Sequence, residues 1–208
     1  GKTFLPPAFI EVLNQYDPVS GSHSGDIDAR LAALDSEGVS QELAFPNAIL
    51  ALLHWPDKNI RELCFRIYNE YLAGVQERSN GRIWGVGLVN WWDAEGAART
   101  LAELKALGLR TFLMPLNPGK DDDGKPIDYA GTAMAGVWDA IEESGVPVSH
   151  HIGETTPGIP SQVNTLGVGM LQSVAPFREV FAKYILGGIL DRHPTLKVGW
   201  FEGGSDIG

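Results

Sequence analysis

The sequence has little of several features that would assign it to a specialised class of protein. It contains one cysteine, Cys64, so no disulfide can form within the chain, and a reducing compartment is the simpler expectation. No basic cluster occurs, and the formal net charge of -10 argues against a nucleic-acid partner. No apolar run approaches the ~20 residues that span a bilayer, and no secretory signal pattern is present. We therefore expect a cytoplasmic protein that acts on a small molecule.

Amphipathic helical stretches alternate with short β-branched or aromatic runs from Asp26 onward, which is typical of a parallel sheet with helices between its strands. We expect an irregular N-terminal segment over residues 1–25 and one α/β domain, a (β/α) barrel, over residues 26–208. The predicted helices cover residues 28–37, 59–78, 94–107, 132–144 and 176–191. The predicted strands cover residues 41–45, 83–89, 110–116, 146–151 and 196–201.

The predicted helix over residues 59–78 has the apolar spacing of a helix that buries one face. Its apolar residues at that spacing are Ile60, Leu63, Cys64, Ile67, Tyr71 and Val75. Cys64 fits this pattern as a small core residue.

Polar residues lie at the carboxyl ends of all five predicted strands, namely Asn47, Asn90, Asn117, His151 and Glu202. In (β/α) barrels the catalytic groups gather at the carboxyl ends of the strands. Asparagine also favours turns, so each asparagine taken singly is weak evidence, whereas His151 and Glu202 have no such explanation. The pattern predicts a site with Asn47 and Asn90 as substrate contacts.

Two neighbouring histidines, His150 and His151, end the fourth predicted strand just before a glycine-rich loop. Neighbours on a strand point to opposite faces, so these two side chains are not expected to bind one ion together. We predict that His151 faces the barrel mouth as a metal ligand, because histidine is the commonest side-chain ligand. We predict that His150 supports it as a packed residue hydrogen-bonded to a helix.

The loops after the strands hold further candidates. Three tryptophans, Trp55, Trp91 and Trp92, suggest an apolar wall for a ring-bearing substrate, although loop tryptophans also pack against other loops or a second subunit. Residues 155–173 are long for a loop between strand and helix, and they suggest a lid.

Four segments in this order resemble the amidohydrolase-2 family, which includes aminocarboxymuconate-semialdehyde decarboxylase and γ-resorcylate decarboxylase. They are residues 28–39, residues 41–46, His151-Ile-Gly153 and the run Gly187-Gly-Ile-Leu-Asp-Arg-His-Pro-Thr-Leu-Lys-Val. The resemblance extends from about residue 26 to the last residue. It implies a distorted (β/α)₈ barrel with one divalent metal ion, usually zinc or manganese. His193, which precedes a strand, is expected to be a structural residue near the barrel floor.

The resemblance also implies a ligand set. Family members use a His-x-His or Glu-x-His pair after the first strand, a histidine after the fifth and an aspartate after the eighth, and His151 matches the fifth-strand ligand. Glu202 occupies the place of the family's acid–base histidine after the sixth strand. No His-x-His occurs in the sequence. The five predicted strands would then be the second to the sixth, and three of the four metal ligands would be missing.

The resemblance implies a metal-dependent hydrolase or a non-oxidative decarboxylase that acts on a small aromatic or carboxylated substrate. One zinc ion, or manganese, would polarise a substrate oxygen or activate water, and Glu202 would move a proton. Glu202 has two other readings, as an additional ligand or as a carboxylate that binds an arginine or a helix N-terminus. We expect a homodimer or a higher homo-oligomer. The alternative is a catalytically silent barrel fragment or scaffold.

Overall fold

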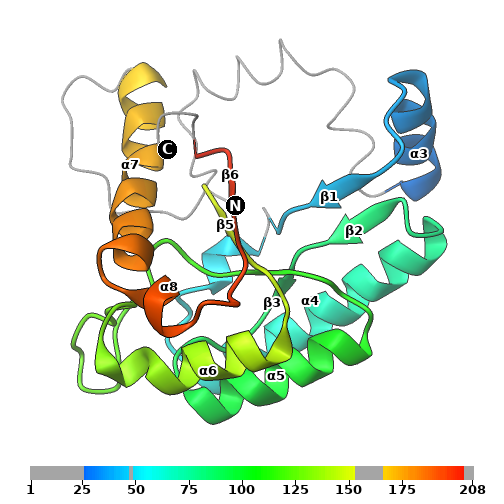
Figure 1. Cartoon of the computed structure of the whole chain (residues 1–208). Helices are drawn as coiled ribbons and strands as arrows, with labels where there is room; N and C mark the ends of the chain where they lie inside the picture. The colour runs from blue at the N-terminus through cyan, green and yellow to red at the C-terminus, as the bar shows by residue number, and fades with distance from the viewer. Residues whose placement is uncertain (1–25, 47–48, 153–165, 204–208) are drawn as a thin grey trace.

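The computed structural model describes residues 26–46, 49–152 and 166–203, and the strands in these ranges form a two-stranded and a four-stranded parallel sheet (Figure 1). Every strand pair is parallel, and the pairing order is β1-β2 and β3-β4-β5-β6. Val86 joins the two groups, because its N–H donates to the Ala44 carbonyl while the next N–H, of Gly87, donates to the Thr111 carbonyl. The strands are β1 (Glu42–Ala44), β2 (Ile83–Gly85), β3 (Gly87–Leu88), β4 (Phe112–Leu113), β5 (Val148–His151) and β6 (Val198–Phe201).

Helices connect successive strands and lie on the outer side of the sheet, with α4, α5 and α6 below the strands in Figure 1 and α7 to their left. They are α3 (Ile27–Ser36), α4 (Lys58–Arg78), α5 (Ala94–Ala106), α6 (Ala135–Ser144), α7 (Leu166–Ile185) and α8 (Ile189–Arg192), with 3-10 turns at Leu50–Leu52 and Thr132–Met134. Asp26, Asp57 and Asp93 cap α3, α4 and α5 by accepting backbone N–H groups. Within the described ranges, no helix is long and apolar enough to cross a membrane.

The predicted α/β fold of consecutive parallel strands is confirmed, and each predicted strand contains an observed one. The last long helix is a correction. Helix α7 begins at Leu166 rather than at residue 176 and ends at Ile185, so Pro176 lies inside it. A proline inside a helix removes one backbone hydrogen bond. Val174 and the fully buried Phe177, on either side of Pro176, pack against the core and stabilise the helix at this point. The predicted lid is therefore helical from residue 166, and its earlier part lies outside the described residues.

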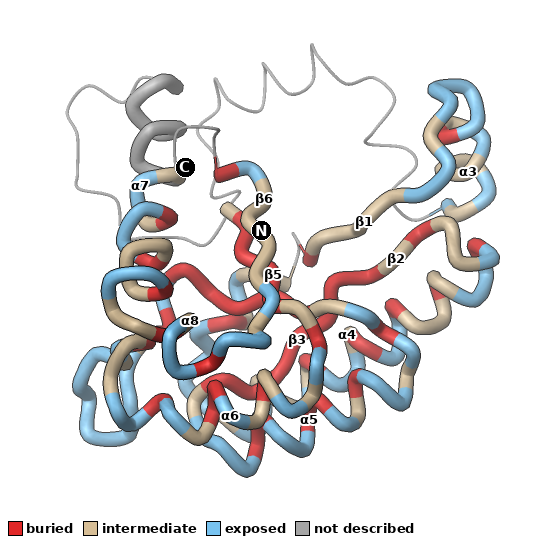
Figure 2. Tube along the Cα trace, viewed as in Figure 1, coloured by how far each residue is buried: buried red, intermediate tan, exposed pale blue. Residues whose placement is uncertain are grey.

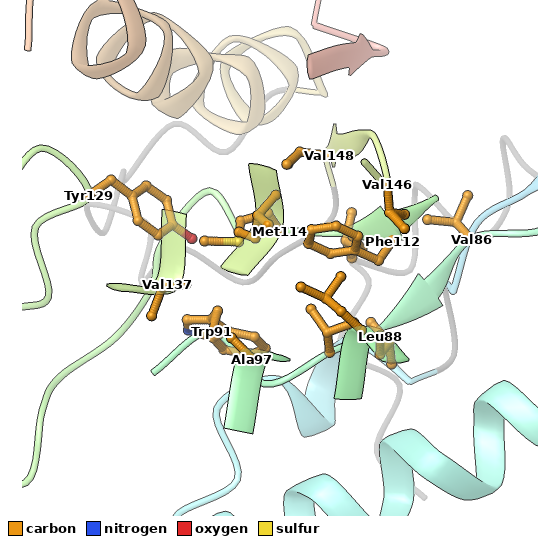
Figure 3. Packing of buried hydrophobic residues seen from close by; sticks show 14 of the residues in the cluster. Val86, Leu88, Trp91, Ala97, Phe112, Met114, Tyr129, Val137, Val146 and Val148 are labelled. Atoms are coloured by element: carbon orange, nitrogen blue, oxygen red, sulfur yellow. The ribbon is translucent and has the colours of Figure 1, made fainter. Parts of the chain in front are cut away.

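One large hydrophobic core lies between the sheet and the helices, and β4 and β5 are buried along their whole length. Figure 2 shows the buried stretches beside the labels of β3 and β5. Figure 3 shows Phe112 and Met114 of the β4 segment beside Val148 of β5, with Leu88 of β3 close by. Trp91, just after β3, is fully buried and packs near Ala97 of α5. Packing at this density gives the carboxyl ends of the strands fixed positions.

Helix α4 buries a different face from the predicted one. Its buried residues are Phe65, Asn69, Leu72 and Val75, of which only Val75 was expected. The Asn69 side chain explains the rotation. Its Nδ2 donates to the Leu88 carbonyl and its Oδ1 accepts the Leu88 N–H, both at 2.8 Å, as a neighbouring strand would. The polar residue that breaks the apolar pattern therefore fixes the helix against β3.

Replacing Asn69 with alanine should destabilise the fold by roughly 2–4 kcal/mol, because both backbone groups of Leu88 would stay buried without partners. Chemical denaturation with a fixed m-value measures the change. Glu143→Ala on the exposed face of α6 is the matched control and should change the free energy of unfolding by less than about 0.5 kcal/mol. Equal stability of Asn69→Ala and the native protein would refute this role of the amide.

Candidate functional site

His151 and Glu202 lie side by side at the carboxyl ends of β5 and β6. The parallel register pairs His151 with Phe201, so the next residue, Glu202, comes just beyond the end of the histidine strand. His151 Nε2 is 3.5 Å from Glu202 Oε2. The imidazole is nearly buried, with a side chain 10% exposed, whereas the Glu202 side chain is 62% exposed. The strand register therefore brings together the two residues that the strand-end pattern selected.

A backbone carbonyl fixes the orientation of the His151 ring. Nδ1 donates to the Ile152 carbonyl at 2.5 Å, and because a carbonyl only accepts, Nδ1 is the nitrogen that carries the proton in the neutral ring. Nε2 then directs a lone pair towards the Glu202 carboxylate. Two acceptors that face each other can bind a cation between them. This is the tautomer in which a histidine binds a metal through Nε2.

The backbone of Glu202 has an unusual conformation for a residue with a side chain. Its φ is +57°, in the left-handed region, where a residue other than glycine costs about 1–2 kcal/mol. The turn directs the carboxylate back towards His151 immediately after β6 ends. Strained residues are enriched at functional sites, which is consistent with a functional reading of Glu202.

Two phenylalanines complete the surroundings of the pair. The Phe45 ring, just after β1, stacks on the His151 imidazole with centroids 4.2 Å apart and an interplanar angle of 26°. It also contacts Phe201 of β6, with centroids 4.9 Å apart. The ends of β1, β5 and β6 thus converge on one point. Sequence reasoning missed Phe45 and Phe201, although the position of Phe45 at a strand end was the available signal.

His150 faces the opposite side of β5, as the alternation of strand residues requires. It is fully buried, its Nε2 lies 3.0 Å from the Tyr184 hydroxyl of α7, and its ring stacks on Trp200 of β6 at 4.7 Å. Burial lowers the pKa of His150 to about 3, and the nearby Met114 backbone only partly offsets that effect. His150 is therefore a neutral packing residue in contact with α7, and its supporting role for His151 stays a prediction.

The structure does not support substrate contacts for Asn90 and Trp91. The Asn90 carboxamide is buried and holds the turn before α5, because it accepts the Trp92 and Asp93 N–H groups and donates to Glu62 and Asp93. The Trp91 indole donates to the Pro118 carbonyl from inside the core. Both side chains are thus occupied in holding the fold.

The other predicted positions lie elsewhere. Trp55 is 45% exposed in the loop before α4. Asn47 lies outside the described residues. His193 is buried before β6, where its Nδ1 lies 3.3 Å from Glu142 Oε2 of α6. Hydrogen bonds from Thr195 lower the pKa of Glu142. The predicted structural role of His193 is confirmed by these contacts.

The donor atoms of the site fit part of a metal centre. His151 Nε2 and Glu202 Oε2 are 3.5 Å apart, close to the ~3.3 Å between two donors of a tetrahedral zinc ion with bonds of about 2.0–2.1 Å. Among the described residues, however, no group of three or more His, Cys, Asp or Glu residues could hold a metal ion. The described residues therefore supply at most two ligands of one metal ion at this site, His151 and Glu202.

Solved structures share this fold. An amidohydrolase from Mycobacterium avium subsp. paratuberculosis K-10 is 23% identical with a TM-score of 0.70, over 86% of this chain and 49% of that one. A 2,6-dihydroxybenzoate decarboxylase, solved with 2,6-dihydroxybenzoate, is 19% identical with a TM-score of 0.67, over 90% and 61% of the chains. A manganese-bound 5-carboxyvanillate decarboxylase from Novosphingobium aromaticivorans DSM 12444 is 17% identical with a TM-score of 0.60, over 82% and 47%.

The chain spans about half to three-fifths of the length of these structures. A search of curated proteins finds no match. The parallel strands of the described residues thus correspond to part of an amidohydrolase TIM barrel, as the sequence predicted. Because the Amidohydro_2 (amidohydrolase) family model matches residues 20–204, the chain belongs to the amidohydrolase family.

Proposed function

We propose that this chain contributes to a metal-dependent decarboxylase of small aromatic carboxylates, with His151 as a metal ligand and Glu202 as the acid–base group. The observation that carries the proposal is the 3.5 Å approach of His151 Nε2 to Glu202 Oε2 at the carboxyl end of a parallel sheet. Two of the structural neighbours are decarboxylases of aromatic carboxylates, and one of them was solved with manganese. The Phe45–Phe201 contact adds an aromatic surface at the same point, suited to a ring-bearing substrate.

His151 has one role in this scheme, to hold the metal through Nε2. The Ile152 carbonyl keeps the proton on Nδ1, and the Phe45 ring restricts rotation of the imidazole. A bound zinc or manganese ion would supply Lewis-acid polarisation of a substrate oxygen. The remaining ligands would come from outside the described residues, since these hold no three-ligand group.

Glu202 is the acid–base residue of this scheme and protonates the ring carbon. Non-oxidative decarboxylation breaks the bond between the ring carbon and the carboxylate carbon, releases CO₂, and leaves an electron pair on the ring carbon that takes up one proton. A protonated Glu202 would donate that proton, and its exposed side chain would then recover one from water. No oxidant or reductant is required. In a hydrolytic reaction the same carboxylate would instead take a proton from the attacking water.

A catalytically silent scaffold is the second candidate function. It is favoured by one observation, that the described residues provide fewer than three clustered metal ligands. A scaffold would neither bind a metal ion nor turn over a substrate. Measurements of metal content and of activity therefore distinguish it from an enzyme.

The intact gene product should bind one zinc or manganese ion per chain and should release CO₂ from hydroxybenzoates. Elemental analysis after dialysis measures the ion, and CO₂ detection over a panel of hydroxybenzoates and their esters separates decarboxylation from hydrolysis. Ester cleavage without CO₂ release would assign a hydrolase. A protein with neither metal nor turnover would be the scaffold.

Substitutions at His151 and Glu202 should distinguish the metal ligand from the acid–base group. His151→Ala should remove the metal and the activity together, because it deletes a ligand. Glu202→Gln should keep the metal and lower kcat by roughly 10²–10⁴-fold, the usual contribution of a general acid or base. Glu95→Gln, at an exposed carboxylate of α5, is the control. Full metal occupancy in His151→Ala would contradict the ligand assignment, and loss of metal in Glu202→Gln would make Glu202 a ligand.

Phe45 is a positioning residue for the imidazole, and its replacement should affect metal affinity. Phe45→Leu keeps an apolar side chain but removes the stacking ring, which is worth about 0.5–1.5 kcal/mol, or roughly 2- to 12-fold in affinity. Phe45→Tyr retains the ring and should bind metal nearly as tightly as the native protein. Competition with a chelator measures both values. Equal losses in the two variants would show that the stack does not orient His151.

A further inference from the structure

Helix α4 carries an apolar stripe that no other part of the described chain covers. Four large hydrophobic side chains along one face are 44–57% exposed, and these are Ile60, Leu63, Ile67 and Tyr71. They recur every three or four residues, which is the spacing of a helix face that packs against another element. The opposite face of α4 already packs against the sheet through Phe65 and Leu72. The helix therefore has two apolar faces, and one of them lacks a partner within the described residues.

We propose that this stripe binds the same stripe of a second copy of the chain, with the two helices antiparallel and a two-fold axis at Ile67. A two-fold interface requires a surface that is complementary to itself. The stripe is symmetric in sequence about Ile67, because Leu63 and Tyr71 lie four residues away on either side, and Ile60 and Gly74 lie seven residues away. An antiparallel partner therefore places Leu63 against Tyr71, and Ile60 against Gly74.

The surface at Gly74 leaves open space beside the helix. A shallow hollow opens there, with a mixed lining of polar and apolar residues that includes Glu70, Ala73, Gly74, Gln76, Glu77 and Leu107. A Cβ placed on Gly74 would meet no atom within 4 Å. The projecting Ile60 at one end of the stripe thus matches an open glycine at the other end, as close packing of two helices requires.

The charges beside the stripe favour the antiparallel orientation. Arg66 and Glu70 are both exposed on the same flank of α4. Pairing about Ile67 puts Arg66 opposite residue 68 of the second copy, two residues, or ~3 Å along the axis, from Glu70. Two symmetric Arg66–Glu70 pairs result. In a parallel two-fold pair these flanks would lie on opposite sides of the interface, so the Arg66–Glu70 pairs would not form.

Sedimentation velocity on the native chain should show a dimer, and Ile67→Asp should convert it to a monomer with an unchanged circular dichroism spectrum. The matched control is Leu186→Asp, because Leu186 is the most exposed large hydrophobic residue described, at 86%, and lies after α7 rather than on α4. This control should remain a dimer. A monomeric native chain, or a dimer that Ile67→Asp leaves intact, would overturn the proposal. A dimer disrupted equally by Leu186→Asp would place the interface elsewhere.

Charge reversals test the orientation. Arg66→Glu and Glu70→Arg should each weaken the dimer at least several-fold, since each puts like charges together across the interface. An equimolar mixture of the two variants should dimerise again, because every cross-interface pair in the mixed dimer is then of opposite sign. Failure of the mixture to recover would rule out the antiparallel pairing.

Cross-linking gives an independent measurement. The sequence has one cysteine, so Cys64→Ala provides a cysteine-free background. In that background Ile67→Cys should form an intermolecular disulfide on mild oxidation, because the two-fold axis brings the two positions together. Leu63→Cys should not, since its partner across the axis is Tyr71. Cross-linking of Leu63→Cys as efficiently as Ile67→Cys would indicate parallel helices and refute the proposal.

Discussion

The register between β5 and β6 is the constraint on which the candidate site depends. Parallel pairing sets His151 beside Phe201, so the first residue after β6 has to fall next to the imidazole. A shift of one residue would exchange the faces of the strand and put Trp200 at the site and Phe201 in the core. The ring stack of His150 on Trp200 opposes such a shift from the other face of the sheet. Core packing on one side of β5 thus fixes the positions of His151 and Glu202 on the other side.

The two neighbouring histidines show how far environment separates identical side chains. His150 lies in the core, where burial holds it neutral and Tyr184 provides its hydrogen-bond partner. His151 is held by the carbonyl of Ile152 and by the Phe45 ring, with Nε2 facing a carboxylate. The first side chain positions the strand, and the second presents a lone pair at its end. Because successive side chains of a strand point to opposite faces, two neighbouring histidines can have these two different environments.

The sequence predicts the strand order and the pairing of His151 with Glu202, because both follow from periodicity and from the geometry of parallel strands. It does not predict which apolar face of α4 is buried, since that depends on Asn69 reaching the backbone of β3. It also fails for Asn90 and Trp91, which follow a strand as site residues do but turn into the fold. The sequence shows which residues follow a strand. It does not show where their side chains point, because tertiary contacts set that direction.

The exposed apolar stripe of α4 also results from the contact between Asn69 and the backbone of β3. If Ile60, Leu63, Ile67 and Tyr71 had formed the core face, Asn69 would have pointed away from β3 and left the Leu88 backbone without its two hydrogen bonds. Burying Phe65 and Leu72 instead satisfies that backbone and leaves an apolar surface on the outer side of the helix layer. The outer face of α4 does not include the ends of β5 and β6, so association through it leaves the His151–Glu202 pair accessible to a substrate.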